Sequence, residues 1–198
     1  VFSPHIYPPG MEAGANYGPI DKGTIAEWAK YRAADKKLHK ASLFCTEFGG
    51  KNDRGPSSEK YLDDFCAQLD ELKAGWAGWS HDIYPMIGSV NYNLFKEDRS
   101  EYPTLGRLIR TYPRATAGYL RAFKYDAATR KFNMAYISNT AISKPTEIFI
   151  PDRHYPEGWK VSVQGTDQYT QEWNPERQIL SIFVNENNRE MKVSIEPK

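Results

Sequence analysis

The sequence lacks the features typical of nucleic-acid-binding proteins and of small disulfide-rich folds. Its 198 residues include only two cysteines, Cys45 and Cys66, too few to staple a fold and without the spacing of a zinc site. Two buried thiols are the simpler interpretation, and a bridge between them in an oxidising compartment stays open. The net charge is +1, with both signs interspersed along the chain. A nucleic-acid partner, which needs clustered basic residues, is therefore not expected.

Long apolar runs and nucleotide or metal motifs are also missing. No stretch approaches the roughly 20 apolar residues of a membrane-spanning helix, and the first residues lack the pattern of a signal peptide. There is no glycine-rich phosphate loop, no paired-histidine zinc signature and no Gly-x-Ser-x-Gly elbow. The composition, 40% hydrophobic and 26% charged, is typical of a soluble globular protein with a real core. No cofactor and no metal are expected.

The first 116 residues alternate short apolar runs with helical patterns, which predicts an α/β fold with parallel strands. Thr24 with Glu27 has capping-box spacing, Ser57 or Ser58 opens a second helix, and Gly75 ends it. Strands are expected at residues 1–7, 41–47 and 76–80, and helices at residues 24–40, 57–74 and near 105–109. Three parallel strands leave two open edges, so a companion chain or segment is expected to cover them.

From about residue 117 the pattern changes to short alternating strands separated by turns, with no helical period. This pattern predicts an antiparallel β-sandwich of about 80 residues, and a domain boundary near residues 113–117. Strands are expected at residues 119–125, 132–138, 146–150, 159–164, 178–184 and 191–195.

The clearest candidate site is Glu47, which ends an apolar strand and is followed by Phe48, Gly49 and Gly50. Catalytic side chains of α/β barrels lie at the carboxyl ends of the strands, where they reach into the mouth of the barrel. A carboxylate that only caps the strand end, or pairs with a nearby lysine, remains the alternative.

Two other strand ends carry side chains suited to a sugar site. His5 and Tyr7 lie on the same side of the first strand, so a Tyr7 hydroxyl is expected to donate to the Glu47 carboxylate. Trp79 ends the third strand and offers an aromatic plane to a pyranose ring. Each has a structural alternative, as a barrel-mouth or core residue. His81 and Asp82 are adjacent and point apart on an extended chain, so a catalytic dyad is not expected there.

In their order and spacing, these strand ends resemble the sixth to eighth strand ends of a glycoside hydrolase family 5 barrel. Within that family the likeness is to endoglycoceramidases and related glucosylceramide-cleaving enzymes. It is carried by LIRTYPRATAG at residues 108–118, which resembles their junction between barrel and sandwich, by TEIFIP at residues 146–151, and by Tyr155-Pro156. The resemblance implies the C-terminal portion of a (β/α)8 TIM barrel at residues 1–116, followed by a β-sandwich at residues 117–198.

The resemblance also implies roles for single residues. Glu47 matches the nucleophile, Tyr7 the tyrosine that hydrogen-bonds it, His5 a histidine of the active-site rim, and Trp79 the sugar-stacking tryptophan. The family's acid/base glutamate follows an asparagine in the fourth strand, and no such Asn-Glu-Pro occurs here. The acid/base is therefore expected on an N-terminal chain or segment that completes the barrel.

The activity implied is retaining cleavage between a glucose-headed glycan and a lipid, without cofactor, at a membrane surface and in a secreted, lysosomal or vacuolar location. Residues 83–87 are the candidate for part of an apolar rim that admits the lipid. The alternative function is a non-catalytic carbohydrate-binding or structural protein derived from such a hydrolase.

Overall fold

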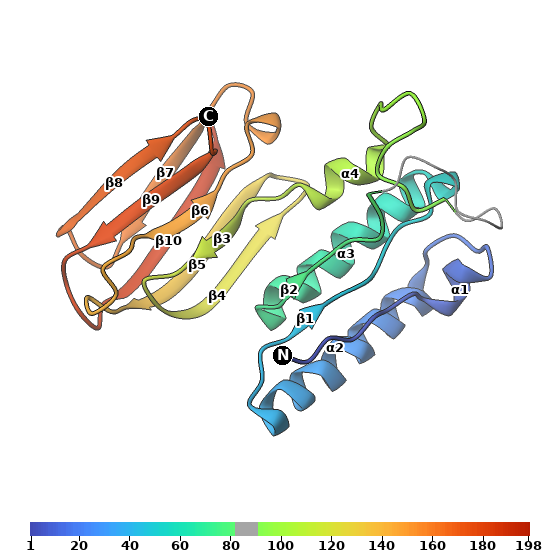
Figure 1. The fold of residues 1–198 in the computed structure, drawn as a ribbon, viewed down its shortest axis with the longest axis horizontal. Coiled ribbons are helices and arrows are strands. Elements are labelled where there is room, and N and C mark those ends of the chain that lie inside the picture. The colour runs from blue at the N-terminus through green and yellow to red at the C-terminus, as the bar shows by residue number, and fades with distance from the viewer. Residues whose placement is uncertain (82–90) are drawn as a thin grey trace. The chain divides into compact units, whose positions relative to one another are not determined.

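The computed structural model describes residues 1–81 and 91–198 and divides the chain into two compact units, Val1–Ile109 and Arg110–Lys198 (Figure 1). Each unit has its own hydrophobic core. The division falls before the expected residue 116, because Tyr112–Ala115 forms strand β3 and pairs with β6, Thr146–Phe149, in the second unit.

The first unit contains three parallel stretches of chain with helices between them. The stretch around Phe2 and His5 bridges to Leu43 and Glu47, and β1 pairs with β2 in parallel register. The bounds are α1 Pro9–Glu12, α2 Pro19–His39, β1 Phe44–Cys45, a 3-10 turn Asn52–Arg54, α3 Pro56–Leu72, β2 Gly75–Trp76 and α4 Pro103–Leu108. This βαβαβ order is the predicted one, although the regular strands are shorter than expected.

Both long helices begin differently from the prediction. The backbone N–H of Gly18 donates to Asp21 Oδ2 at 3.1 Å and Pro19 occupies the first turn, so α2 starts five residues before Thr24. The Thr24 hydroxyl donates to the Ile20 carbonyl inside the helix. The predicted Thr24–Glu27 capping box is therefore wrong.

The predicted serine cap of α3 is wrong as well. This helix starts at Pro56 after Gly55, whose φ of 46° favours glycine. Ser57 Oγ accepts from the Tyr17 N–H at 2.6 Å, and Ser58 Oγ donates to the Lys51 carbonyl at 2.6 Å. The helix also ends at Leu72, with Lys73 in the left-handed C-cap position, so Gly75 is free to pair with Phe44 in the sheet.

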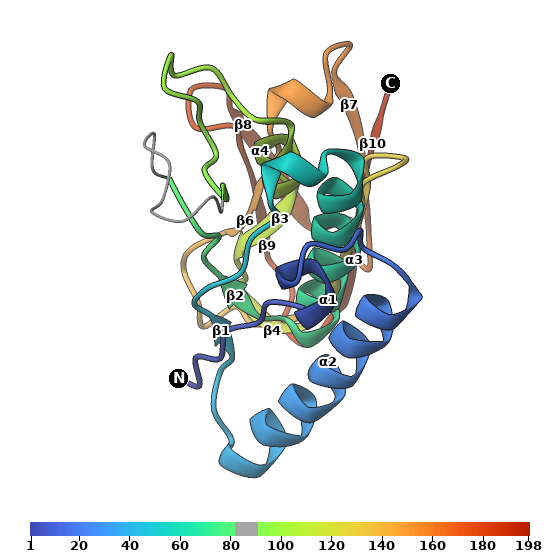
Figure 2. The same cartoon turned by 90° about the vertical axis from the view of Figure 1, so that its right-hand side faces the viewer.

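The core of the first unit lies between the strands and α2 and α3, which cover one side of β1 and β2 (Figure 2). Phe48 and Phe65 are fully buried and meet edge to face at 4.9 Å between ring centroids. Each fully buried ring of this kind contributes roughly 1.5–3 kcal/mol to folding. Cys45 and Cys66 lie in the same core as free thiols, as predicted. Burial raises the pKa of the Cys45 thiol to about 11, so it stays protonated and unreactive at neutral pH.

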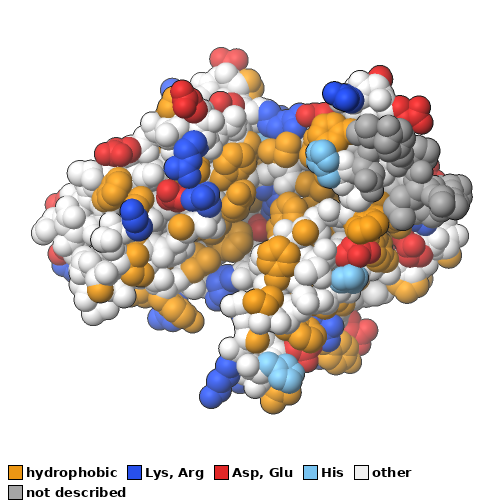
Figure 3. Space-filling model, in the orientation of Figure 1, with side chains coloured by type: hydrophobic (Ala, Val, Ile, Leu, Met, Phe, Trp, Pro, Cys, Tyr) orange, Lys and Arg blue, Asp and Glu red, His pale blue; other side chains and the backbone are white. Residues whose placement is uncertain are grey.

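The face of these strands away from the helices has no layer of its own within the described residues of this unit. Phe44 is 39% exposed there, and Val1 is 89% exposed at the start of the N-terminal stretch. Hydrophobic side chains reach the surface of this unit in the space-filling view (Figure 3). A parallel sheet is normally buried on both faces, and the described residues of this unit cover only one of them.

The second unit is the predicted antiparallel β-sandwich. Its two sheets have the strand orders β4-β5-β10-β7 and β3-β6-β9-β8. Inward-facing residues such as Phe132, Ile148 and Ile182 are fully buried between them. The remaining bounds are β4 Gly118–Asp126, β5 Lys131–Ser138, a 3-10 turn Asp152–His154, β7 Trp159–Gln164, β8 Tyr169–Asn174, β9 Ile179–Val184 and β10 Glu190–Pro197.

None of the helices within residues 1–81 and 91–198 combines the length and apolar character needed to span a bilayer.

Candidate active site

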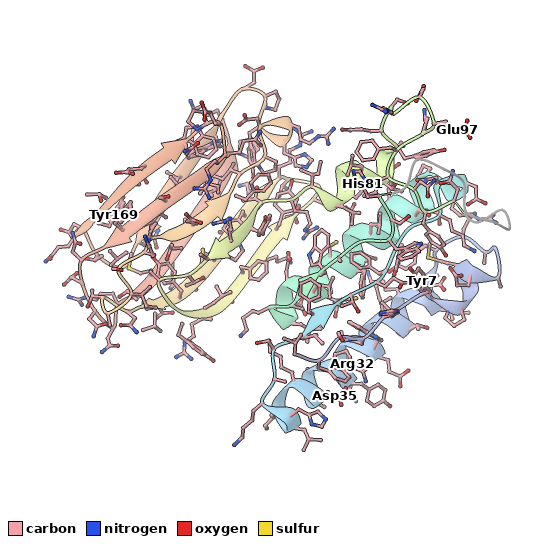
Figure 4. The ribbon with its side chains drawn as sticks, viewed as in Figure 1. Tyr7, Arg32, Asp35, His81, Glu97 and Tyr169 are labelled. Atoms are coloured by element: carbon pink, nitrogen blue, oxygen red, sulfur yellow. The ribbon has the colours of Figure 1, made fainter. Side chains whose placement is uncertain are left out.

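The carboxyl ends of the three parallel stretches lie side by side and place the candidate residues at one edge. The Ile6 N–H donates to the Glu47 carbonyl at 3.3 Å, and the Trp79 N–H donates to the Phe48 carbonyl at 2.7 Å. Tyr7 immediately follows Ile6 at the end of the N-terminal stretch (Figure 4). The backbone pairing therefore brings together Tyr7, Glu47 and Trp79, which are far apart in the sequence.

The Glu47 carboxylate is held by Tyr7, which was predicted to meet it, and by His5. Tyr7 Oη donates to Glu47 Oε1 at 2.9 Å, which confirms the predicted hydrogen bond, and His5 Nδ1 lies 3.4 Å from Glu47 Oε2. The Glu47 side chain is 27% exposed, so the carboxylate is oriented by its neighbours and still reachable from solvent. An oriented, accessible carboxylate is suited to nucleophilic or acid–base chemistry.

The pKa of Tyr7 is raised well above its usual value. Burial is the main cause, followed by the hydrogen bond to Glu47 and the repulsion between a phenolate and that carboxylate. Tyr7 consequently keeps its proton across the physiological range. It can act only as a donor toward Glu47.

The lysine-pairing alternative for Glu47 finds no support in the described part of the chain. Within residues 1–81 and 91–198, its carboxylate meets Tyr7 and His5 and forms no ion pair with lysine or arginine. Its role as nucleophile nevertheless stays a prediction.

Gly49 explains how the backbone at Trp79 comes close to the Glu47 segment. A Cβ added at Gly49 would lie 2.5 Å from the Trp79 carbonyl oxygen and 3.0 Å from the ring of Tyr92. The first distance is shorter than real Cβ contacts and involves backbone, and the second would require the Tyr92 ring to shift, so glycine permits this approach. Trp79 is half-buried there, and its role as a sugar platform stays a prediction.

Three residues near the site, Glu12, Lys51 and Tyr92, were not predicted from the sequence. Tyr92 donates from its hydroxyl to Glu12 Oε1, and Lys51 Nζ donates to the Glu12 carbonyl at 2.9 Å. The ring of Tyr92 meets the ring of Tyr7 edge to face, with centroids 5.4 Å apart. Glu12 ends the short helix α1, and Lys51 and Tyr92 lie in loops without hydrophobic periodicity. Only the position of Lys51, directly after Gly49-Gly50, hinted at proximity to the site.

The other candidates lie apart from this carboxylate or outside the described residues. His81 is exposed, and its ring packs against Phe95 at 5.1 Å. Asp82 and the proposed rim at residues 83–87 fall in the part of the chain that the structure does not describe. Among the described residues, no group of three or more histidine, cysteine or acidic side chains is placed to hold a metal ion.

Known proteins resemble this chain in sequence and in fold. The model of the glycoside hydrolase family 5 C-terminal domain matches residues 110–196. Endoglycoceramidase I of Rhodococcus hoagii (strain 103S) is 32% identical over 142 residues, which are 70% of this chain and 24% of that protein. Two solved structures of endo-glycoceramidase II from Rhodococcus sp. share the fold over 99% of this chain. Its ganglioside GM3 complex has a TM-score of 0.81 at 22% identity, and its lactosyl-enzyme intermediate 0.77 at 24%.

The match to the glycoside hydrolase family 5 C-terminal domain thus extends over nearly all of the second unit. The chain as a whole is related to the endoglycoceramidases of that family, which confirms the resemblance found in the sequence. It spans 24% of the Rhodococcus hoagii protein and 42% of the solved ganglioside complex.

Proposed function

We propose that this chain is the C-terminal part of a retaining glycoside hydrolase that cleaves between a glucose-headed glycan and a lipid. Glu47 is the nucleophile, Tyr7 orients it, and His5 and Trp79 contact the sugar. The observation that carries this role is the 2.9 Å hydrogen bond from Tyr7 to Glu47, because it aims a partly exposed carboxylate at the end of a strand.

The chemistry is a double displacement. A Glu47 oxygen attacks the anomeric carbon, the bond to the lipid oxygen breaks, and that oxygen takes a proton from an acid/base carboxylic acid. Water then attacks the same carbon, gives its proton to the acid/base, and releases Glu47 with retention of configuration. An ionised carboxylate offers about four lone-pair sites, and Tyr7 and His5 face two of them, so an attacking lone pair remains.

The acid/base belongs, in this proposal, to an N-terminal segment that completes a (β/α)8 barrel. Two features support it: the open edges and uncovered face of the three parallel stretches, and the 42% share of the solved ganglioside complex that the chain spans. The completed site places the second carboxylate about 5–5.5 Å from that of Glu47, the separation of retaining enzymes.

The glycolipid substrate is supported by the names of the relatives, since one solved structure is a ganglioside GM3 complex and another a lactosyl-enzyme intermediate. The aromatic face of Trp79 suits a pyranose ring, whose C–H face packs on an aromatic plane. A lipid-linked substrate brings the enzyme to a membrane surface. Such substrates suit the extracytoplasmic location expected from the resemblance.

Cleavage of a glycosphingolipid by the full-length protein that carries this chain tests the proposal. With a substrate labelled on its ceramide, we expect release of free labelled ceramide together with an intact oligosaccharide. Chromatography and mass spectrometry detect the two products. Proton NMR of the first product should show the anomeric configuration of the substrate.

The outcomes separate the two functions. Release of ceramide with retained configuration supports the hydrolase. Retention of the labelled lipid on the protein without any cleavage contradicts it and favours the carbohydrate-binding alternative. Release with inverted configuration leaves a hydrolase but removes Glu47 from the role of nucleophile.

A further inference from the structure

A cluster of three side chains next to Tyr7 joins the segments that follow the three parallel stretches. Glu12 comes from α1, just after the stretch that ends in Tyr7. Lys51 follows the Glu47 segment, and Tyr92 lies beyond β2. Tyr92 is 6% exposed and Lys51 7%, whereas the Glu12 side chain is 41% exposed. Each of the three segments thus contributes one member to a cluster beside Tyr7, with two members buried and Glu12 reaching the solvent.

The contacts within this cluster are polar and aromatic. Tyr92 donates its hydroxyl proton to Glu12 Oε1, while Lys51 Nζ donates to the Glu12 carbonyl and lies 3.7 Å from the same Oε1. Lys51 Nζ also lies 5.9 Å from the centre of the Tyr92 ring. Burial and the bond to Glu12 raise the pKa of Tyr92, so its hydroxyl remains a donor.

Two further sets of hydrogen bonds hold the segment around Tyr92. The Ser80 N–H donates to the Tyr92 carbonyl at 3.3 Å, beside Trp79. Asn52 grips both neighbours of Tyr92, because its Nδ2 donates to Asn91 Oδ1 at 2.9 Å and to the Asn93 carbonyl at 2.7 Å. These contacts fix the position of Tyr92, whose ring packs against the ring of Tyr7.

We propose that Tyr92, anchored by Glu12 and Lys51, is a positioning residue that holds the Tyr7 ring so that its hydroxyl donates to Glu47. This inference rests on the proposed function of Glu47 as nucleophile. The edge-to-face contact at 5.4 Å limits the rotation of the Tyr7 ring, whose hydroxyl donates to the Glu47 carboxylate. Tyr92 acts through Tyr7 and leaves substrate binding to other residues.

The test compares two Tyr92 variants of the full-length protein in glycosphingolipid hydrolysis. Tyr92→Phe keeps the ring and removes the bond to Glu12, so we expect kcat to fall about three- to tenfold. Tyr92→Leu also removes the ring edge against Tyr7, so we expect a loss of about 30- to 100-fold, in line with the effect of misplacing a catalytic group by about 1 Å. KM should stay nearly unchanged in both, because a group that acts only on the orientation of the nucleophile affects the chemical step.

Tyr17→Phe is the matched control. Tyr17 is also buried in the first unit, and its hydroxyl donates to a carboxylate, Asp64 Oδ2, at 3.0 Å. Its loss costs a hydrogen bond of the same type away from Glu47. We expect the stability of this variant to fall about as much as that of Tyr92→Phe, with kcat unchanged.

Repeating the Tyr92→Phe change in a Tyr7→Phe variant distinguishes a positioning role of Tyr92 from a general loss of structure. In Tyr7→Phe the hydroxyl that Tyr92 is proposed to place is already gone, so adding Tyr92→Phe should lower kcat no further. A loss of the same factor in both backgrounds overturns the inference. So does a kcat of Tyr92→Phe equal to that of Tyr17→Phe.

A crystal structure of Tyr92→Phe or Tyr92→Leu decides the matter independently of activity. We expect the Tyr7 hydroxyl to leave Glu47 in the leucine variant, with the distance rising beyond 3.5 Å. An unchanged distance near the present 2.9 Å overturns the positioning role. If the wild-type protein proves inactive on every glycolipid, the proposed function fails, and this distance still tests the contact.

Discussion

Replacing Glu47 with glutamine is expected to abolish glycolipid hydrolysis by the full-length protein, with a loss of at least about a thousandfold in kcat. The amide has nearly the volume of the carboxylate and still accepts the hydrogen bond from Tyr7. It lacks the negative charge that attacks the anomeric carbon. The fold should therefore persist while the chemical step is lost.

Glu27→Gln provides the matched control for this variant. Glu27 lies on the exposed side of α2, where the Tyr31 hydroxyl approaches it at 3.4 Å, so the same change removes a charge away from the site. We expect unchanged activity and, for both variants, a circular dichroism spectrum like that of the wild type. Activity of Glu47→Gln within about tenfold of the wild type would exclude Glu47 as the nucleophile.

The two units are expected to differ sharply when produced separately. Arg110–Lys198 should fold alone, because both inner sheet faces of the sandwich are covered and its core residues, such as Phe132 and Ile182, are fully buried. Val1–Ile109 should show no cooperative transition. Its regular strands are two residues long, Phe44 is exposed on a bare face, and the outer edges have no partner strand among the described residues.

Urea titration followed by circular dichroism, with sedimentation to report the association state, measures this difference. Adding the N-terminal segment of the full-length protein should restore a cooperative transition to Val1–Ile109. The requirement for a companion segment is refuted if the isolated first unit is monomeric and unfolds cooperatively.

The strand-end residues were predictable because each directly follows an apolar run. Glu47 follows Leu43, Phe44 and Cys45, and parallel strands end at one edge, so its meeting with Tyr7 required no knowledge of the loops. The sandwich was predictable for a similar reason: period-two alternation in β5 and β10 places one face of each strand in the core.

Helix starts and two strands, β3 and β8, were not predictable from periodicity. The start of α2 depends on Pro19 and on the bond from the Gly18 N–H to Asp21, whereas Thr24 with Glu27 only mimics a cap. Strand β8, Tyr169–Asn174, has just two large inward residues, Tyr169 and Trp173, separated by polar ones. It forms a hairpin with β9, the next strand along the chain, and lies at the edge of its sheet.

The loop cluster behind Tyr7 was out of reach for a different reason. Three separate segments supply the cluster: Glu12 at the end of α1, Lys51 39 residues later, and Tyr92 a further 41 residues along the chain. Their contacts depend on how the strands pair. Nothing in the local sequence of any one loop indicates the other two. Such residues are found only once the backbone is assembled.

Trapping of the glycosyl-enzyme tests the central claim most directly. The full-length protein is treated with a 2-deoxy-2-fluoro glucoside bearing a good leaving group, which slows hydrolysis of the intermediate, and is then digested for mass spectrometry. We predict that the sugar mass is added to the peptide containing Glu47 and that the adduct is absent from Glu47→Gln. An adduct on another carboxylate, or turnover to an inverted product without any adduct, would contradict the assignment of Glu47 as the nucleophile of a retaining enzyme.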